Sequence, residues 1–130
     1  MLILMIRSDQ QMAELYLNQD RECLVKHVWE ANHQLAESIN KEIRQLLKKT
    51  KLTLSQLQAI GVYSGPGSFT SLRIGHSVAN ALAYGLQLPI VEAGGEDWQA
   101  SIVAMLEEGK NDRLVVPLYG APPRTTKPRK

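Results

Sequence analysis

The sequence of 130 residues contains one cysteine and no long apolar run. The single thiol, Cys23, has no second cysteine with which to form an internal disulfide, so disulfide-stabilised secreted scaffolds are excluded. Residues 1–6 are apolar, but Arg7 ends the run well short of the roughly 20 residues that a membrane span needs. No basic segment precedes the run, as it would in a signal peptide. We therefore expect a soluble cytoplasmic protein in which Cys23 is a buried structural thiol.

Sequence patterns for metal sites and for hydrolytic catalysis are also missing. His27, His33 and His76 lack metal-ligand spacing, and neither His-Glu-x-x-His nor a paired-cysteine motif occurs. Ser64 and Ser68 flank a Gly-Pro-Gly turn, but the Gly-x-Ser-x-Gly pattern of a nucleophile elbow is absent. We predict no catalytic residue, no metal and no cofactor, and for His76 a surface or interface position.

The composition and charge fit one ordinary globular domain. Hydrophobic residues make up 44% and charged residues 22% of the chain. Four of the 15 lysine and arginine residues lie in 124–130, which contains no acid. We predict a domain over residues 1–120 and a basic, proline-containing tail over 121–130. Because affinity for a phosphate backbone needs several basic groups on one face, a solvated tail is favoured over a nucleic-acid arm.

The apolar pattern changes along the chain from short strand-like runs to helical spacing. Asn32 and Ser68 are predicted N-caps of two helices, and Pro117 favours an edge position for the last strand. The order β-β-β-α-β-α-β-α-β predicts an α/β fold in which helices cover a mixed sheet. The expected strands are 2–6, 12–18, 23–29, 58–63, 88–91 and 113–119, the expected helices are about 32–49, 69–86 and 96–108, and 53–56 form a short turn.

A glycine-rich turn between a strand and a helix occupies residues 61–75. Backbone N–H groups converge at such a helix N-terminus, where the helix dipole favours an anion. The alternative is that the glycines only allow a sharp turn and close packing of the helix, and this alternative is favoured because no P-loop lysine is present. The candidate phosphate or nucleotide residues are Gly65, Gly67, Ser68, Thr70 and Arg73.

Small residues recur every four positions on the helix at 69–86, at Gly75, Ala79 and Ala83. Such a ridge allows another helix to approach closely. The ridge packs either within the chain or against another protein, and the sequence leaves both open. The candidate partner-interface residues are Leu35, Ile39, Ile43, Leu72, Gly75, His76, Ala79 and Ala83.

Residues 64–94 resemble the signature of the TsaB (YeaZ) family, GPGSFTGxRIG followed by an alanine-rich helix and a short strand. The resemblance extends to the N-terminal strands, to His33, to the strand at 89–92 and to the Pro-Leu-Tyr segment at 117–119 with the tail after it. It covers roughly residues 1–98 and 113–130. The matching positions are Gly65, Pro66, Gly67, Ser68, Phe69, Thr70, Arg73, Ile74 and Gly75.

The resemblance implies an actin, sugar-kinase and Hsp70-like (ribonuclease H-like) fold and a role without catalysis. TsaB-like proteins pair with TsaD, which transfers the threonylcarbamoyl group to adenosine 37 of tRNA, and a TsaE-type ATPase joins them. The pairing uses two helices from each N-terminal domain, here those at about 32–49 and 69–86. The same surface supports a homodimer when the partner is absent, and contact with tRNA is indirect or through the basic tail.

Three departures from the family pattern bear on function. Arg7, Ser8 and Asp9 stand where the family has Asp-Thr-Ser, and Ser71 stands where it has glycine. Only residues 99–112 separate Trp98 from the expected closing strand, so we expect a shortened form that lacks most of the second domain. These departures argue against nucleotide turnover and favour a scaffold subunit. The alternatives are a nucleotide- or phosphate-binding protein that uses the 64–73 loop, or a homodimeric regulator.

Overall fold

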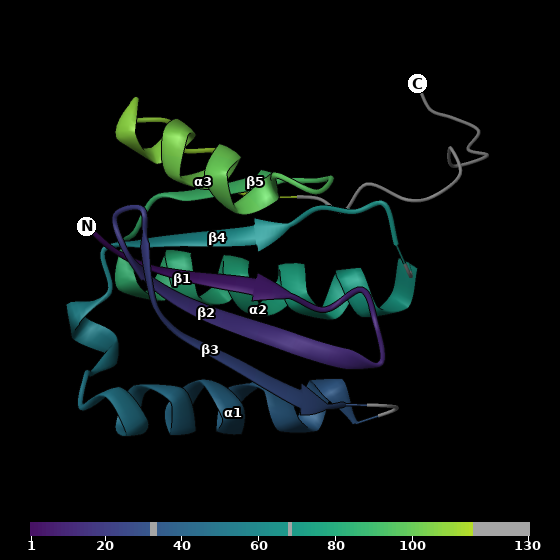
Figure 1. Cartoon of the computed structure of the whole chain (residues 1–130). Coiled ribbons are helices and arrows are strands. Elements are labelled where there is room, and N and C mark those ends of the chain that lie inside the picture. The colour runs from purple at the N-terminus through teal and green to yellow at the C-terminus, as the bar shows by residue number, and fades with distance from the viewer. Residues whose placement is uncertain (32–33, 68, 116–130) are drawn as a thin grey trace.

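The computed structural model describes residues 1–31, 34–67 and 69–115. In this part of the chain, five strands form one sheet in the order β3-β2-β1-β4-β5 (Figure 1). The strands are β1 (Leu2–Arg7), β2 (Met12–Gln19), β3 (Glu22–Glu30), β4 (Ala59–Tyr63) and β5 (Ile90–Ala93). The helices are α1 (Leu35–Thr50), the 3-10 turn η1 (Leu54–Gln56), α2 (Phe69–Leu86) and α3 (Trp98–Glu107).

The sheet is mixed because two kinds of connection build it. β1, β2 and β3 are joined by short turns and pair antiparallel, with Leu4 opposite Leu17 in the first pair. β4 and β5 pair parallel to β1 and to each other, and each follows a helical crossover. The predicted α/β class with a mixed sheet is confirmed.

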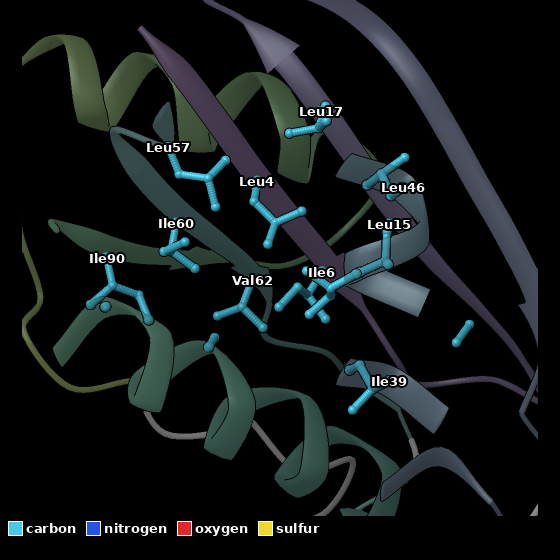
Figure 2. Close-up of a cluster of buried hydrophobic side chains, with 14 of the residues drawn as sticks. Leu4, Ile6, Leu15, Leu17, Ile39, Leu46, Leu57, Ile60, Val62 and Ile90 are labelled. Atoms are coloured by element: carbon cyan, nitrogen blue, oxygen red, sulfur yellow. The ribbon is translucent and has the colours of Figure 1, made fainter. Parts of the chain in front are cut away.

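Helices cover both faces of the sheet. Leu4 and Ile6 of β1 point toward α1 and α2, where they pack with Ile39 and Val62 (Figure 2). The alternate residues of β1, Ile3 and Met5, pack on the other face against Trp98 and Ile102 of α3. Since successive side chains of a strand point to opposite faces, a fully apolar β1 is the sequence of a strand that is buried on both sides.

The helix α1 follows the predicted apolar spacing but begins later than predicted. Its N-cap position is Gln34, so the prediction that Asn32 is the N-cap was wrong, and residue 32 itself lies outside the described residues. The helix ends at Lys51, which adopts a left-handed φ of 62°. The Leu52 N–H then bonds to the Leu47 carbonyl at 2.9 Å, which satisfies an end carbonyl of the helix. The helix α2 starts where predicted, and its predicted cap Ser68 lies outside the described residues.

The predicted strand at 113–119 is wrong for its described part. Asn111 and Asp112 already occupy the outer edge of β5: Asn111 Oδ1 accepts from the Ile90 N–H at 3.1 Å, and the Asp112 N–H donates to the Ile90 carbonyl at 2.7 Å. Arg113 then adopts a φ of 66° and turns the chain away from the sheet. Residues 116–119 with Pro117, and the predicted tail 121–130, lie outside the described residues.

Two smaller predictions have clear outcomes. The short turn at 53–56 is confirmed as η1, where the Thr53 N–H donates to Gln56 Oε1 at 2.8 Å. Cys23 was predicted to be buried, which was wrong: it is exposed, because β3 is an edge strand. None of the helices in the described ranges is long and apolar enough to cross a membrane.

Candidate functional site

The glycine-rich loop lies at the carboxyl ends of β4 and β5. The Ser64 N–H donates to the Ala93 carbonyl at 2.9 Å, and the Tyr63 hydroxyl donates to the Pro66 carbonyl at 3.0 Å. Gly65 has a φ of 107°, a conformation that favours glycine. Its carbonyl oxygen would lie 2.1 Å from a Cβ at Gly94, so the two loop segments touch through their backbones. The loop is therefore held to the end of β5.

An ion pair at the end of β1 fills the space beside this loop. Arg7 Nε donates to Asp9 Oδ1 at 2.7 Å, and the guanidinium lies 4.1 Å from the centre of the Tyr63 ring. The hydrogen bond to Asp9 raises the pKa of Arg7 above its usual range. The Asp9 side chain is only 7% exposed, and a Cβ at Gly67 would come within 2.6 Å of it. The carboxylate nearest the loop is thus neutralised within the chain.

The predicted phosphate residues do not gather around one hollow. Gly65 and Gly67 pack against Gly94 and Asp9, as described above. Thr70 and Arg73 are exposed and line a hollow of ≈ 390 Å³ between α1 and α2. Ser68 lies outside the described residues. Phosphate or nucleotide binding by this loop stays a prediction.

The predicted interface residues lie inside the domain. They share one property: each faces the sheet from α1 or α2, and each is buried. Their exposed fractions leave no surface for a partner to touch, so the assignment of a contact surface to these residues is corrected. The buried residues are Leu35, Ile39, Ile43, Leu72, Gly75, His76, Ala79 and Ala83.

The outer surface of the same two helices forms a groove, which we call the α1–α2 groove. The hollow of ≈ 390 Å³ adjoins a second of ≈ 270 Å³, and the two share Ser77 and Val78. Ile74, Val78 and Leu82 are half-buried along it. The lining residues are Ala36, Asn40, Thr70, Arg73, Ile74, Ser77, Val78, Ala81 and Leu82.

The sequence contains a signal for this groove, although a weaker one than for the core. The strongest apolar stripe of an amphipathic helix faces the core, and on α2 that stripe holds Ala79 and Ala83. A second, shorter row of apolar residues, Ile74, Val78 and Leu82, lies next to it at a spacing of four. Such a row beside a complete core stripe indicates a half-buried helix face.

His76 was predicted at a surface or an interface, and this was wrong. Its side chain is 2% exposed, and Nδ1 lies 2.8 Å from the Leu72 carbonyl. Nε2 lies 3.4 Å from Glu92 Oε1 on β5. Within the described part of the chain, neither of these two atoms has a hydrogen-bond partner. His76 therefore holds α2 against β5 in the interior.

Comparison with known proteins places this fold. A family model described as "TsaD: tRNA N6-adenosine threonylcarbamoyltransferase" matches residues 29–116. A tRNA N6-adenosine threonylcarbamoyltransferase of Geotalea daltonii is 37% identical over 78 residues, which are 60% of this chain and 22% of that protein. The tRNA threonylcarbamoyladenosine biosynthesis protein TsaB of Haemophilus influenzae is 33% identical over 69 residues, 53% of this chain and 29% of that protein. The chain thus spans less than a third of either relative.

Solved structures agree with the sequence matches. YeaZ from Pseudomonas aeruginosa has a TM-score of 0.68 at 26% identity, covering 83% of this chain and 50% of that chain. RuvC from T. thermophilus, at 12% identity and a TM-score of 0.50, covers 72% of this chain and 65% of that chain and shares the fold alone. The likeness to YeaZ confirms the predicted actin and ribonuclease H-like fold. The chain therefore belongs to the family of the tRNA N6-adenosine threonylcarbamoyltransferase TsaD, and within that family it is a TsaB (YeaZ)-type member.

Proposed function

We propose that the chain is a non-catalytic accessory subunit in the formation of threonylcarbamoyladenosine at position 37 of tRNA. Its partner is a TsaD-type threonylcarbamoyltransferase, and the contact is made through the α1–α2 groove. Relatives named TsaB and TsaD both match this chain, which supports a pairing of two related domains. Participation of a TsaE-type ATPase, and of tRNA through residues 121–130, stays a prediction.

The α1–α2 groove is the observation that carries this proposal. Its floor is apolar at Ile74, Val78 and Leu82, whereas Ala36 and Ala81 on its sides are exposed and small. Small side chains let a second pair of helices approach to the short interaxial distances of close helix packing. A TsaD-type domain with the same two helices would complete a four-helix arrangement on this surface. An apolar groove of this length gains stability when a partner removes it from water.

The end of β1 supports a role without catalysis. Arg7 stands where the resemblance places the first aspartate of Asp-Thr-Ser, and its guanidinium pairs with Asp9. The Asp9 carboxylate is therefore engaged within the chain, next to the loop where related nucleotide-binding proteins hold phosphates. The TsaD-type partner, rather than this chain, would supply metal and nucleotide.

A charge placed in the α1–α2 groove tests the proposal. Ala81→Glu introduces a carboxylate at an exposed position of the groove, so the fold should be kept while co-purification with the TsaD-type protein of the same organism is lost. Ser101→Glu adds the same charge at an exposed position of α3, on the other face of the sheet, and should leave binding unchanged. Equal binding of Ala81→Glu and the unaltered chain would overturn the groove as the contact surface.

The second candidate function is a homodimeric regulator. The observation that favours it is the same groove, which a second copy of the chain could also cover. Light scattering of the chain alone and with the TsaD-type protein separates the two functions. A homodimer that persists unchanged when the TsaD-type protein is added in excess would favour the regulator, whereas exchange to a heterodimer favours the accessory subunit.

A further inference from the structure

The strand β3 lies at the edge of the sheet, far from the α1–α2 groove. It runs for nine residues and pairs with β2 along one side, and no described residue pairs with its other side. Edge strands of natural proteins are usually protected by prolines, by bulges or by short length. Residues 22–30 contain no proline, and the one register shift with β2 falls at Leu17 and Asn18, away from the second half of β3.

The backbone groups of three residues point to the open side of β3. The Ala31 N–H donates to the Gln11 carbonyl at 2.9 Å, in line with the pair Met12 and Glu30. In an antiparallel pair, hydrogen-bonded and non-hydrogen-bonded residues alternate. The N–H and C=O groups of Glu30, Val28 and Lys26 therefore point away from β2, where another strand could accept and donate.

The side chains of the same three residues share the face of the sheet opposite α1. Their neighbours in sequence contact α1 instead: Trp29 Nε1 donates to Ser38 Oγ at 3.0 Å. His27 likewise pairs with Glu42 of α1. These contacts hold β3 in place from behind. Of the outward residues, Lys26 and Glu30 are exposed, and Val28 is 41% exposed.

The order Lys26, Val28, Glu30 is complementary to itself in one antiparallel register. With Val28 opposite Val28 of a second copy, Lys26 of each copy lies opposite Glu30 of the other. A register centred on Lys26 instead sets Lys26 against Lys26 and Glu22 against Glu30. Opposite charges directly across a strand pair are stabilising, and like charges are destabilising. The charges therefore select the register centred on Val28.

We propose that β3 pairs with β3 of a second copy of this chain, antiparallel and with a two-fold axis at Val28. The two sheets then form one continuous sheet, and each of Lys26, Val28 and Glu30 exchanges backbone hydrogen bonds across the axis. In the single copy, the Lys26 ammonium lies 5.6 Å from the Tyr16 ring centre, and Glu30 accepts from Gln11 Nε2 at 3.4 Å. Both contacts are loose, so these side chains can turn toward a partner strand. The α1–α2 groove stays free.

Disulfide trapping tests the register, because the chain has a single cysteine. In a Cys23→Ser background, Val28→Cys places two thiols on residues directly opposite each other, with Cα atoms about 5.5 Å apart as in hydrogen-bonded antiparallel pairs. Mild oxidation should then give a covalent dimer on a non-reducing gel. The matched control is Lys26→Cys in the same background, whose two thiols would lie roughly 14 Å apart along the strands and should not link. Equal linking of the two variants would overturn the register.

Exchange of the charges tests the interface without cysteines. Lys26→Glu and Glu30→Lys should each weaken the dimer about tenfold or more in sedimentation velocity, because two attractive pairs become repulsive. The double variant Lys26→Glu/Glu30→Lys should recover dimerisation to within about threefold of the unaltered chain. Failure of the double variant to recover, with circular dichroism showing a folded chain, would overturn the proposal. A monomeric unaltered chain at several hundred micromolar would overturn it as well.

A further variant separates this dimer from one made through the α1–α2 groove. Ala81→Glu lies in the groove and should leave the β3 dimer intact. Loss of all dimer in Ala81→Glu, together with no effect of Lys26→Glu, would assign dimerisation to the groove and overturn the β3 pairing.

Discussion

The side-chain amide of Asn80 on α2 makes both hydrogen bonds that the backbone of Val115 offers. Asn80 Nδ2 donates to the Val115 carbonyl at 3.1 Å, and the Val115 N–H donates to Asn80 Oδ1 at 2.9 Å. Val115 is 3% exposed and packs in the core beneath α2. A single amide thus does for this segment what a neighbouring strand does in a sheet, and it directs the chain along α2.

Removal of this amide should loosen the segment after α3. Asn80→Ala leaves a buried N–H and carbonyl of Val115 without partners, so we expect a loss of about 2 kcal/mol in the free energy of unfolding. Urea denaturation measures the loss, and hydrogen exchange at the Val115 amide locates it. Asn80→Asp keeps the acceptor and should retain the bond to the Val115 N–H. Slow exchange at Val115 in Asn80→Ala would contradict this account.

Two glycines that differ in their surroundings should respond oppositely to alanine. A Cβ at Gly94 would stand 2.1 Å from the Gly65 carbonyl oxygen, a backbone atom that cannot easily move. We expect Gly94→Ala to lower the free energy of unfolding by about 2 kcal/mol, as for other overpacked sites. Gly85 lies in α2 with nothing within 4 Å of its Cβ position, so Gly85→Ala should stabilise by about 0.5–1 kcal/mol. Thermal and urea denaturation of the two variants provide the comparison, and a loss in Gly85→Ala would contradict it.

Breaking the ion pair at the end of β1 should cost more than removing it whole. Arg7→Met leaves the 7% exposed Asp9 carboxylate without its cation, and we expect a loss of about 2 kcal/mol. This is less than for a fully buried pair, because the Arg7 side chain is 24% exposed. The double variant Arg7→Met/Asp9→Asn should recover at least half of the loss in urea denaturation. A double variant as unstable as the single one would show that the pair is not the reason.

The Tyr16 hydroxyl should make stability depend on pH in the alkaline range. Burial, together with its hydrogen bond to Glu14, raises the pKa of Tyr16. The folded state therefore keeps this proton more tightly than the unfolded chain, and the stabilisation is lost as the pH rises above the unfolded value of about 10. Between about pH 9 and about pH 11 the free energy of unfolding should fall more steeply than in Tyr16→Phe. Parallel slopes for the two chains would contradict the assignment.

Titration with nucleotide tests the loop at 64–73. Since Arg7 and Asp9 neutralise each other beside Gly67, we expect no saturable heat when ATP is added at millimolar concentration. The TsaD-type protein in the same buffer serves as the positive control. Saturable heat that weakens in Arg73→Ala would instead support the phosphate-binding alternative.

Much of the fold could be predicted because its elements have local signatures. The apolar spacing of Leu35, Ile39 and Ile43 predicts α1, and the apolar run 2–6 predicts a strand buried on both faces. The glycine-rich turn before α2 needs no knowledge of the rest of the molecule. Each of these features depends on residues close together in the chain.

The candidate site could be predicted only in part. The sequence identifies α1 and α2 as the important helices but assigns to their outer surface the very residues that the sheet buries, such as Ala79 and Ala83. The outward residues Val78 and Ala81 become a groove only because α1 lies beside α2. A helix has one strongest apolar stripe, and the sequence does not say whether that stripe meets the sheet or a partner.

The sequence by itself determined the order of helices and strands, the mixed α/β class and the resemblance to TsaB, since all three rest on local patterns and motifs. The tertiary structure alone decided which faces are open. Cys23 is exposed because β3 pairs on one side only, and the predicted strand from Arg113 does not form because Asn111 and Asp112 already bond to β5. Exposure and edge pairing depend on contacts between residues far apart in sequence, and such contacts leave no periodic signal within either segment.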